Sequence, residues 1–287
     1  DYTEWQTLRR YPILNWNMGM TYRLRERDER VYPQGELARR TIGQVGDKGN
    51  YGVEYVLRDV LEGRDGKARR QRIARGFYGR VVGGDNSEPE DGLDVVTTLD
   101  LEMQDVADRA LRRQLEAQNA LWGTALVMEV ATGDLLAMAN LSRTKSGAYA
   151  EVKNHALSSR MEPGSTFKLA ALLALVDDAG MSLDETFDTG NGARVKVGRT
   201  TVQDSHGLPP LNLKDAVAHS SNVFFARAVY ETYKDDPERY VDYLRHLHLD
   251  RTVGLEEFGA VAPIFPAPGM KIWYPDVSIV NMGYGYA

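Results

Sequence analysis

The pattern of hydrophobic and polar residues becomes strongly periodic beyond residue 92. Residues 93–99 read as a strand, and Asp100 follows them as a helix-capping residue. A helix is predicted over 101–118, because its apolar residues recur at helical spacing: Leu101, Val106, Ala107, Ala110, Leu111 and Leu115. Two largely apolar segments, 123–130 and 135–140, are separated by a tight turn. They predict an antiparallel hairpin whose two faces are both covered.

Helical patterns dominate the rest of the chain. The turn signal Pro163-Gly164 precedes an apolar run over 169–176, which is long enough for a buried helix. Ser165 falls at or next to the start of this helix, and Lys168 lies one helical turn further on. Short strands and turns are expected over 183–208. Further helices are predicted over 213–218, after the capping residue Asn212, and over 223–233 and 236–246.

Residues 1–92 differ in composition, because they are polar and rich in charged side chains. The glycines between residues 43 and 52 indicate turns between short strands. A short helix is expected over 54–62, ending at Gly63, and an exposed strand over the basic run 67–75. The polar loop 83–92 is the best candidate for a domain boundary. We therefore expect two domains, 1–92 and 93–287.

Composition narrows the classes of function. The 287 residues carry a formal net charge of −6, which argues against a nucleic-acid-binding protein. There are no cysteines, so disulfides, zinc–thiolate sites and Cys nucleophiles are excluded. The closest histidines, His246 and His248, have no companion cluster, so we expect neither a metal nor a cofactor. No stretch approaches the length of an apolar membrane span.

The candidate chemistry lies in two short motifs. In Ser165-Thr166-Phe167-Lys168, the amine lies on the same helix face as the hydroxyl and can act as its base, provided that burial lowers the pKa of the lysine. Ser165 can equally be a plain helix cap. Ser220-Ser221-Asn222 follows over fifty residues later, and it too can be a helix end and cap. Asp204 and His206 lie in the preceding loop, for which a surface turn is favoured over the alternative that they approach the cleft.

The order of these motifs resembles that of the class B penicillin-binding proteins, the cell-wall transpeptidases. The resemblance covers most of the chain, in the family's order. It includes the nucleophile segment 161–168, the strand pair 123–140, the domain entry 93–104 and a pedestal motif at 30–43. The last is more like the division-specific penicillin-binding protein 3 branch. The implied fold is α+β: an N-terminal β-rich pedestal, then a transpeptidase domain with an antiparallel sheet covered by helices.

The resemblance also implies roles for individual residues. Ser165 would attack the penultimate D-Ala carbonyl of a peptidoglycan stem peptide, with Lys168 as its base. Ser220 would relay a proton to the leaving group, and Asn222 would bind the substrate amide and hold the lysine. The Ser165 backbone N–H would supply half of an oxyanion hole. β-Lactam antibiotics would trap Ser165 as a slowly hydrolysed ester.

The same resemblance implies a setting for the protein. It implies septal cell-wall synthesis at a bacterial membrane, with an N-terminal anchor absent from this chain and an extracytoplasmic catalytic domain. Implied partners are a polytopic glycan polymerase and divisome proteins. An elongation-specific transpeptidase, a penicillin-hydrolysing or penicillin-sensing relative, and a non-catalytic wall-assembly scaffold remain as alternatives.

One motif of the family is missing. The family carries Lys-Thr-Gly or Lys-Ser-Gly on a strand after the second motif, and no such triplet follows Asn222. Lys145-Ser146-Gly147 has the right residues but precedes Ser165, so we interpret it as a chance match. The transpeptidase domain is therefore expected to lack its C-terminal part, and the chain as given to be catalytically incomplete.

Overall fold

The structure is a computed structural model that describes residues 7–8, 10–11, 31–46, 49–67, 70–74, 77–80, 86–252 and 254–286. Residues 1–36 and 37–287 form two separate units, and only the second carries the site. Residues 12–30, and parts of the runs predicted over 67–75 and 83–92, lie outside the described residues.

Short helices, not short strands, flank the glycines between residues 43 and 52. These elements are α2 (Arg39–Ile42), α3 (Gly52–Val56) and α4 (Arg58–Leu61), followed by the antiparallel hairpin β1 (Arg70–Ala74) and β2 (Phe77–Arg80). The turns predicted between strands at 43–52 instead separate helices, and Gln44 and Tyr51 form an isolated bridge. The helix predicted over 54–62 is broken at Leu57 into α3 and α4.

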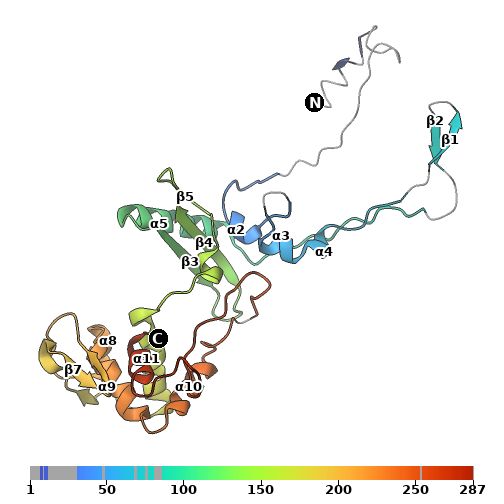
Figure 1. The fold of residues 1–287 in the computed structure, drawn as a ribbon. Coiled ribbons are helices and arrows are strands. Elements are labelled where there is room, and N and C mark those ends of the chain that lie inside the picture. Colours follow the sequence, from blue (N-terminus) through green and yellow to red (C-terminus); the bar gives the residue numbers. More distant parts are fainter. Residues whose placement is uncertain are drawn as a thin grey trace. The chain divides into compact units, whose positions relative to one another are not determined.

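A three-stranded antiparallel sheet in the order β3-β4-β5 follows (Figure 1). Its strands are β3 (Trp122–Met128), β4 (Leu135–Arg143) and β5 (Tyr149–Ala150). Helix α5 (Leu101–Ala117) packs on one face of it and begins at Asp100, whose side chain accepts a hydrogen bond from Met103 N. Ala107 of α5 lies buried against Ala137 and Ala139 of β4. The helix and the hairpin thus form where the apolar periodicity predicts them.

Three details of this region differ from the prediction. Residues 93–99 form no strand, because they have no ladder partner, and Val96 is 95% exposed. Leu101 and Val106 of α5 are exposed, since the helix faces the sheet with Gln104 and Ala107 instead. The hairpin is covered unequally: β4 is buried through its centre, whereas the second half of β3 is exposed.

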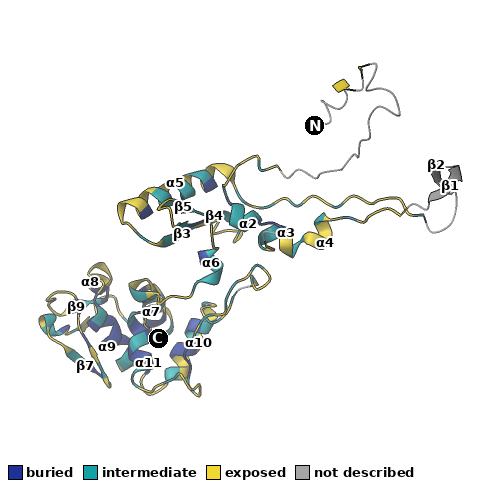
Figure 2. Ribbon diagram, turned by 45° about the horizontal axis from the view of Figure 1, so that its top comes forward, coloured by how far each residue is buried: buried dark blue, intermediate teal, exposed yellow. Residues whose placement is uncertain are grey.

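The remaining residues build a helical region around α9 (Asn222–Tyr233), the most deeply buried helix (Figure 2). Its other helical elements are α6 (His155–Ser158), the 3-10 turn η1 (Gly164–Phe167), α7 (Lys168–Leu173), the π-helical turn η2 (Ala174–Asp178), the 3-10 turn η3 (Gly190–Gly192), α8 (Leu213–Ala218), α10 (Pro237–His246) and α11 (Ser278–Tyr284). Two small antiparallel pairs complete it, β6 (Thr186–Phe187) with β9 (Leu211–Asn212), and β7 (Val195–Val197) with β8 (Thr200–Val202). The three predicted helices after residue 212 are confirmed.

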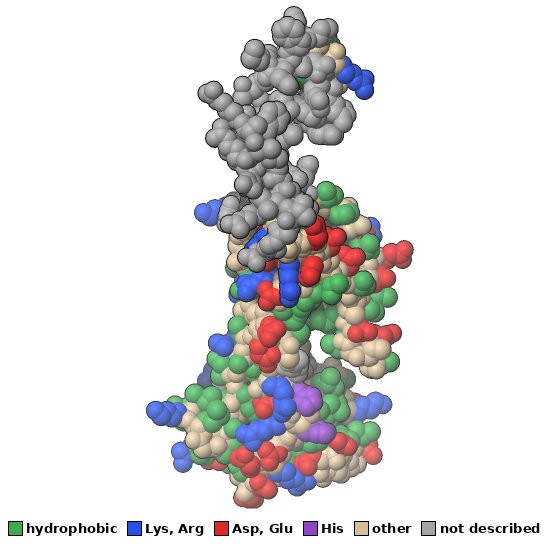
Figure 3. Space-filling view, turned by 90° about the vertical axis from the view of Figure 1, so that its right-hand side faces the viewer, with side chains coloured by type: hydrophobic (Ala, Val, Ile, Leu, Met, Phe, Trp, Pro, Cys, Tyr) green, Lys and Arg blue, Asp and Glu red, His purple; other side chains and the backbone are tan. Residues whose placement is uncertain are grey.

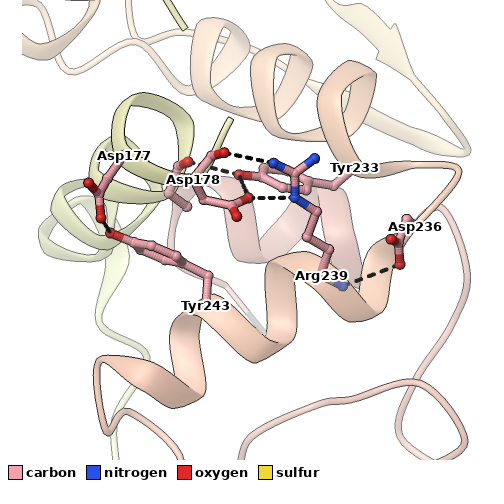
Figure 4. A network of polar contacts seen from close by, with 7 residues as sticks. Asp177, Asp178, Tyr233, Asp236, Arg239 and Tyr243 are labelled. Carbon is pink, nitrogen blue, oxygen red and sulfur yellow. Dashed lines mark hydrogen bonds and ion pairs between the residues drawn. The ribbon is translucent and has the colours of Figure 1, made fainter. Parts of the chain in front are cut away.

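A polar network fixes the far end of the helix that follows Ser165 (Figure 4). The Tyr233 hydroxyl donates to Ala174 O at 2.8 Å and to Asp178 Oδ2 at 2.9 Å. Arg239 pairs with the same Asp178 carboxylate at 2.9 Å, and the Tyr243 hydroxyl donates to Asp177 Oδ2. Because Tyr233 lies on α9 and Arg239 on α10, the network ties η2 to both helices.

Surface charges and helix lengths add two observations. Lys and Arg side chains are interspersed with Asp and Glu on the face drawn in Figure 3. Within the described residues, no helix is both long enough and apolar enough to cross a lipid bilayer.

Candidate active site

Ser165 and Lys168 lie on one short turn that leads into α7. Gly164 begins the 3-10 turn η1 with φ 57°, a conformation that glycine adopts without strain. Ser165 is exposed within this turn, and Lys168, the first residue of α7, is 5% exposed. Lys168 Nζ donates to Ser165 Oγ at 3.0 Å. Ser165 caps neither helical element, so its hydroxyl is left to the lysine.

The second motif lies at the junction of α8 and α9. Ser220, with φ 52°, presents both its carbonyl oxygen and its hydroxyl to Lys168 Nζ, at 2.6 and 3.1 Å. Ser221 is the N-cap of α9, where its side chain accepts a hydrogen bond from Phe224 N. Asn222 begins the helix, and its Oδ1 accepts from Lys168 Nζ at 2.6 Å. Three of the four residues singled out from the sequence, Ser165, Ser220 and Asn222, therefore contact the amine of the fourth, Lys168.

Asp204 also belongs to this site. The sequence analysis favours a surface turn for it over a position near the cleft, but it is only 6% exposed. One carboxylate oxygen accepts from Asn222 N at 2.5 Å and Val223 N at 3.2 Å, and the other accepts from Ser221 Oγ at 2.8 Å. The carboxylate thus satisfies the free N–H groups at the start of α9. No local pattern marks it, because its partners lie 17 to 19 residues away.

His206 does lie on the surface, as predicted. It is exposed, and its ring meets that of His219 edge-to-face with centroids 6.5 Å apart. Among the described residues, no three His, Asp or Glu side chains are grouped so that they could hold a metal ion.

Comparison with known proteins identifies the family. The penicillin binding protein transpeptidase domain matches residues 123–286, more than half of the chain. The chain belongs to this family. Its homologues include class B penicillin-binding proteins named as peptidoglycan D,D-transpeptidases.

Two curated relatives and one solved structure show the extent of the similarity. "Probable peptidoglycan D,D-transpeptidase PenA" of Neisseria meningitidis is 30% identical over 72% of this chain and 38% of its own length. "Penicillin-binding protein PbpB" of Mycobacterium tuberculosis is 31% identical over 83% of this chain and 36% of its own length. The crystal structure of penicillin-binding protein 3 from M. tuberculosis, complexed with aztreonam, is 27% identical, with a TM-score of 0.73 over 91% of this chain and 55% of that one. The chain thus spans less than half the length of these two curated relatives, and its mixed α/β architecture is that of the transpeptidase fold.

The lysine of this candidate site lies in an environment that lowers its pKa. Burial lowers the pKa of Lys168 to about 8, against an opposing effect of the Asp204 carboxylate, which raises it. Its nearest oxygens, on Ser165, Ser220 and Asn222, are uncharged acceptors. A fraction of the amine of roughly one tenth is therefore free to accept a proton at pH 7.

A cavity of about 360 Å³ opens beside the two serines. Its lining combines the polar groups of the site with apolar side chains from α7 to α9: Ser165, Thr166, Lys168, Leu169, Leu172, Val217, Ser220 and Phe225. Its volume is in the range of small-ligand sites. The triplet Lys145-Ser146-Gly147 lies on the turn between β4 and β5 and does not line this cavity, in agreement with its interpretation as a chance match.

Proposed function

We propose that this chain carries the nucleophile-bearing part of a peptidoglycan D,D-transpeptidase that cross-links stem peptides through an acyl-serine intermediate. The observation that carries the proposal is the position of Lys168 Nζ, 3.0 Å from Ser165 Oγ and 3.1 Å from Ser220 Oγ. One amine is therefore within proton-transfer distance of two hydroxyl groups. A serine flanked by such a base is the arrangement that nucleophilic acyl transfer requires.

The proposed acylation assigns a role to each polar group of the site. Neutral Lys168 takes the proton of Ser165 Oγ, which attacks the carbonyl of the penultimate D-Ala. The Ser165 backbone N–H donates to the oxyanion that forms, and Asn222 binds the substrate amide while it holds the lysine. As the peptide bond breaks, the ammonium proton of Lys168 passes through the Ser220 hydroxyl to the departing D-Ala amine. The amine of a neighbouring stem then attacks the ester carbon, and its proton passes through Lys168 to Ser165 Oγ as the ester bond breaks, which forms the new peptide bond and restores the free serine.

We further propose that the protein acts in septal wall synthesis on the extracytoplasmic side of the bacterial membrane, beside a glycan polymerase and divisome proteins. Residues 30–43 resemble the division-specific branch, and the solved relative with a TM-score of 0.73 is a penicillin-binding protein 3. In this proposal, residues 1–92 form the pedestal and 93–287 belong to the transpeptidase domain. Depletion in the source bacterium is expected to give filaments without septa, whereas rounded cells would indicate an elongation role.

Covalent labelling by a fluorescent penicillin tests the catalytic proposal. We expect the full-length protein to retain the label through denaturing electrophoresis, and Ser165→Ala to lose it completely. Ser146→Ala is a control variant, because Ser146 is exposed on the turn between β4 and β5 and does not line the cavity, and it should still be labelled. Labelling that persists in Ser165→Ala would refute the assignment of the nucleophile.

The same experiment separates the alternative functions. Label that appears and is released within minutes would indicate a penicillin hydrolase instead of a transpeptidase. A folded wild-type protein that takes up no label at all would favour a non-catalytic scaffold. A cross-linked product formed from stem peptides together with D-Ala release, both lost in Ser165→Ala and Lys168→Ala, would complete the transpeptidase assignment, whereas D-Ala release without cross-linking would indicate a carboxypeptidase.

A further inference from the structure

The C-terminal end of α11 lies directly against the turn that carries Ser165. Gly285 ends this helix as its C-cap, with φ 96°, and its N–H donates to Asn281 O at 3.1 Å. The Gly285 carbonyl oxygen accepts a hydrogen bond from Gly164 N at 3.0 Å. A Cβ at position 285 would overlap the Gly164 carbonyl oxygen, and it would lie 2.5 Å from the Gly164 carbonyl carbon and 2.9 Å from its Cα. The two glycine backbones are therefore in direct contact.

The contact falls on one particular peptide group. The Gly164 carbonyl that Gly285 touches belongs to the same planar unit as the Ser165 N–H. A rotation of this peptide plane would turn the N–H and the carbonyl together. Gly285 therefore constrains the direction in which the Ser165 N–H points, from a position more than one hundred residues away in the sequence.

Helix α11 is more strongly held in place than the turn that carries Ser165. Helix α11 is anchored in the core, since Ile279 and Val280 are 1% and 0% exposed, and Tyr240 donates to Met282 O. The turn at 164–166 is by contrast half-buried to exposed. A side chain at position 285 would consequently displace the turn rather than the helix.

We propose that Gly285 is a positioning residue that orients the Ser165 N–H toward the oxyanion of the acylation step. This inference rests on the proposed transpeptidase function, in which that N–H is an oxyanion donor. Glycine is required at 285 for two reasons, the left-handed conformation and the absence of a Cβ at the Gly164 carbonyl. The residue touches no reacting atom and acts through the peptide between Gly164 and Ser165.

Gly283 supplies a matched control two residues earlier on the same helix. A Cβ there would approach α9, at 3.0 Å from Phe225 O and 3.2 Å from Val229 Cβ. Gly283 does not have a positive φ. Gly283→Ala should therefore disturb the packing of α11 on α9 without touching the turn that holds Ser165.

The test compares acylation of the full-length protein by an N-acyl-D-alanyl ester and by its thionoester. An oxyanion hole favours the oxygen substrate, because its N–H donors bind a developing oxyanion more strongly than a thiolate-like sulfur. We expect Gly285→Ala to lower the acylation rate of the oxygen ester by about tenfold or more, with KM little changed, as for loss of one oxyanion donor. The thionoester rate should fall less, so the ratio of the two rates should drop. Gly283→Ala should lower the melting temperature and leave the ratio unchanged.

Two outcomes would overturn the proposal. The first is a folded Gly285→Ala protein whose ratio equals that of the wild type, and the second is an equal drop of the ratio in Gly283→Ala. If Gly285→Ala does not fold, Tyr240→Phe replaces it, because it removes the hydroxyl that holds Met282 O and so loosens the end of α11 that carries Gly285, without straining the Gly164 peptide. The ratio should then fall below that of the wild type, and an unchanged ratio in the folded variant would refute the constraint. Failure of the wild type to acylate with either ester would instead refute the proposed function.

Discussion

The helical region around α9 and the sheet beside α5 bury their apolar side chains to very different extents. Phe224 and Phe225 of α9 are fully buried, and Tyr233 is 1% exposed. On β3, in contrast, Leu126 is 51% exposed and Met128 58%. Within the described residues, β3 pairs only with β4, so its outer edge has no partner. The site residues Lys168, Ser220 and Asn222 belong to the region whose core is closed.

This difference indicates which elements determine the geometry of the site. The atoms that surround Lys168 Nζ are held by helix starts, α7 for the lysine and α9 for Asn222, and both helices are fixed by buried side chains. The sheet contributes none of the side chains that contact the lysine. We therefore expect changes in the two regions to have separable effects, of which the largest lie in the helical core.

Phe224→Ala is expected to have the largest effect. Phe224 is 0% exposed and meets Phe187 and Phe225 edge-to-face, at centroid distances of 5.3 and 5.7 Å. Its truncation leaves a cavity at the centre of the core, and should lower the free energy of unfolding by about 3–5 kcal/mol. Urea denaturation measures this loss. A change below about 1 kcal/mol would contradict the description of α9 as the core helix.

Asp204→Asn should reduce both stability and activity. The change weakens the three hydrogen bonds to the start of α9, and charged hydrogen bonds of this kind contribute about 1.5–3 kcal/mol. Penicillin acylation should slow by roughly 10- to 100-fold. Because the Asp204 charge raises the pKa of Lys168, its loss should also shift the pH–rate profile to lower pH.

Asn212→Ala is the matched control for Asp204. Asn212 caps the neighbouring helix α8, by accepting from Asp215 N, and does not contact the lysine. It should cost about 1 kcal/mol of stability and leave the pH–rate profile in place. An equal shift of the profile in both variants would show that Asp204 acts only through general stability.

The pH dependence of wild-type acylation should follow the titration of Lys168. Its pKa is lowered to about 8, and only the neutral amine can take the Ser165 proton. The rate should rise by about tenfold between pH 7 and pH 9 and level off above, since the neutral fraction rises with pH. Stopped-flow measurement with a chromogenic β-lactam gives this profile. A rate that is flat across this range would contradict the role of Lys168 as the base.

These effects also show which parts of the site could be predicted from the sequence. Ser165 and Lys168 are one helical turn apart, and helix geometry alone brings their side chains together. The approach of Ser220 and Asn222 to that pair was inferred only from the order of motifs in a known family. The buried position of Asp204 was not the favoured one, because a buried carboxylate that caps a distant helix leaves no local pattern.

The same distinction explains the errors in the fold. The helices predicted over 101–118, 213–218, 223–233 and 236–246 are present, because their periodicity and their caps, such as Asp100, are local, whereas the short helices α6 and α11 were not predicted. The strand predicted over 93–99 is absent, since a strand depends on a partner that its own sequence does not specify. The unequal covering of β3 and β4 was missed for that reason as well.

Glu151, next to β5, makes the stability of the sheet region depend on pH. Burial raises the pKa of Glu151 to about 7, although Arg40 N donates to its Oε2 at 2.7 Å, and its Oε1 is buried without a hydrogen-bond partner. Because the folded-state pKa lies above the unfolded value of 4.5, the folded protein binds the proton more tightly. This contribution to stability is present below pH 4.5 and is lost as the pH rises through about 7.

Glu151→Gln should remove this pH dependence. The amide keeps an acceptor for Arg40 N and carries no charge, so the variant should be more stable than the wild type at pH 8, by no more than about 3 kcal/mol. At pH 4 the two proteins should unfold at nearly the same temperature. A variant that is less stable at pH 8 would show that the buried carboxylate is ionised and paired in the folded protein.

Leu126→Thr on the exposed edge should have the smallest effect. Leu126 is half exposed, so its truncation should change the free energy of unfolding by no more than about 0.5 kcal/mol, and threonine retains β-propensity. Leu141→Thr on β4 is the matched control, because Leu141 is 0% exposed and should lose about 2 kcal/mol or more. An apolar strand edge also promotes association between molecules, so Leu126→Thr should raise solubility where Leu141→Thr lowers it. Equal destabilisation by both variants would mean that the outer half of β3 is covered in solution, and the contrast between the two regions would then disappear.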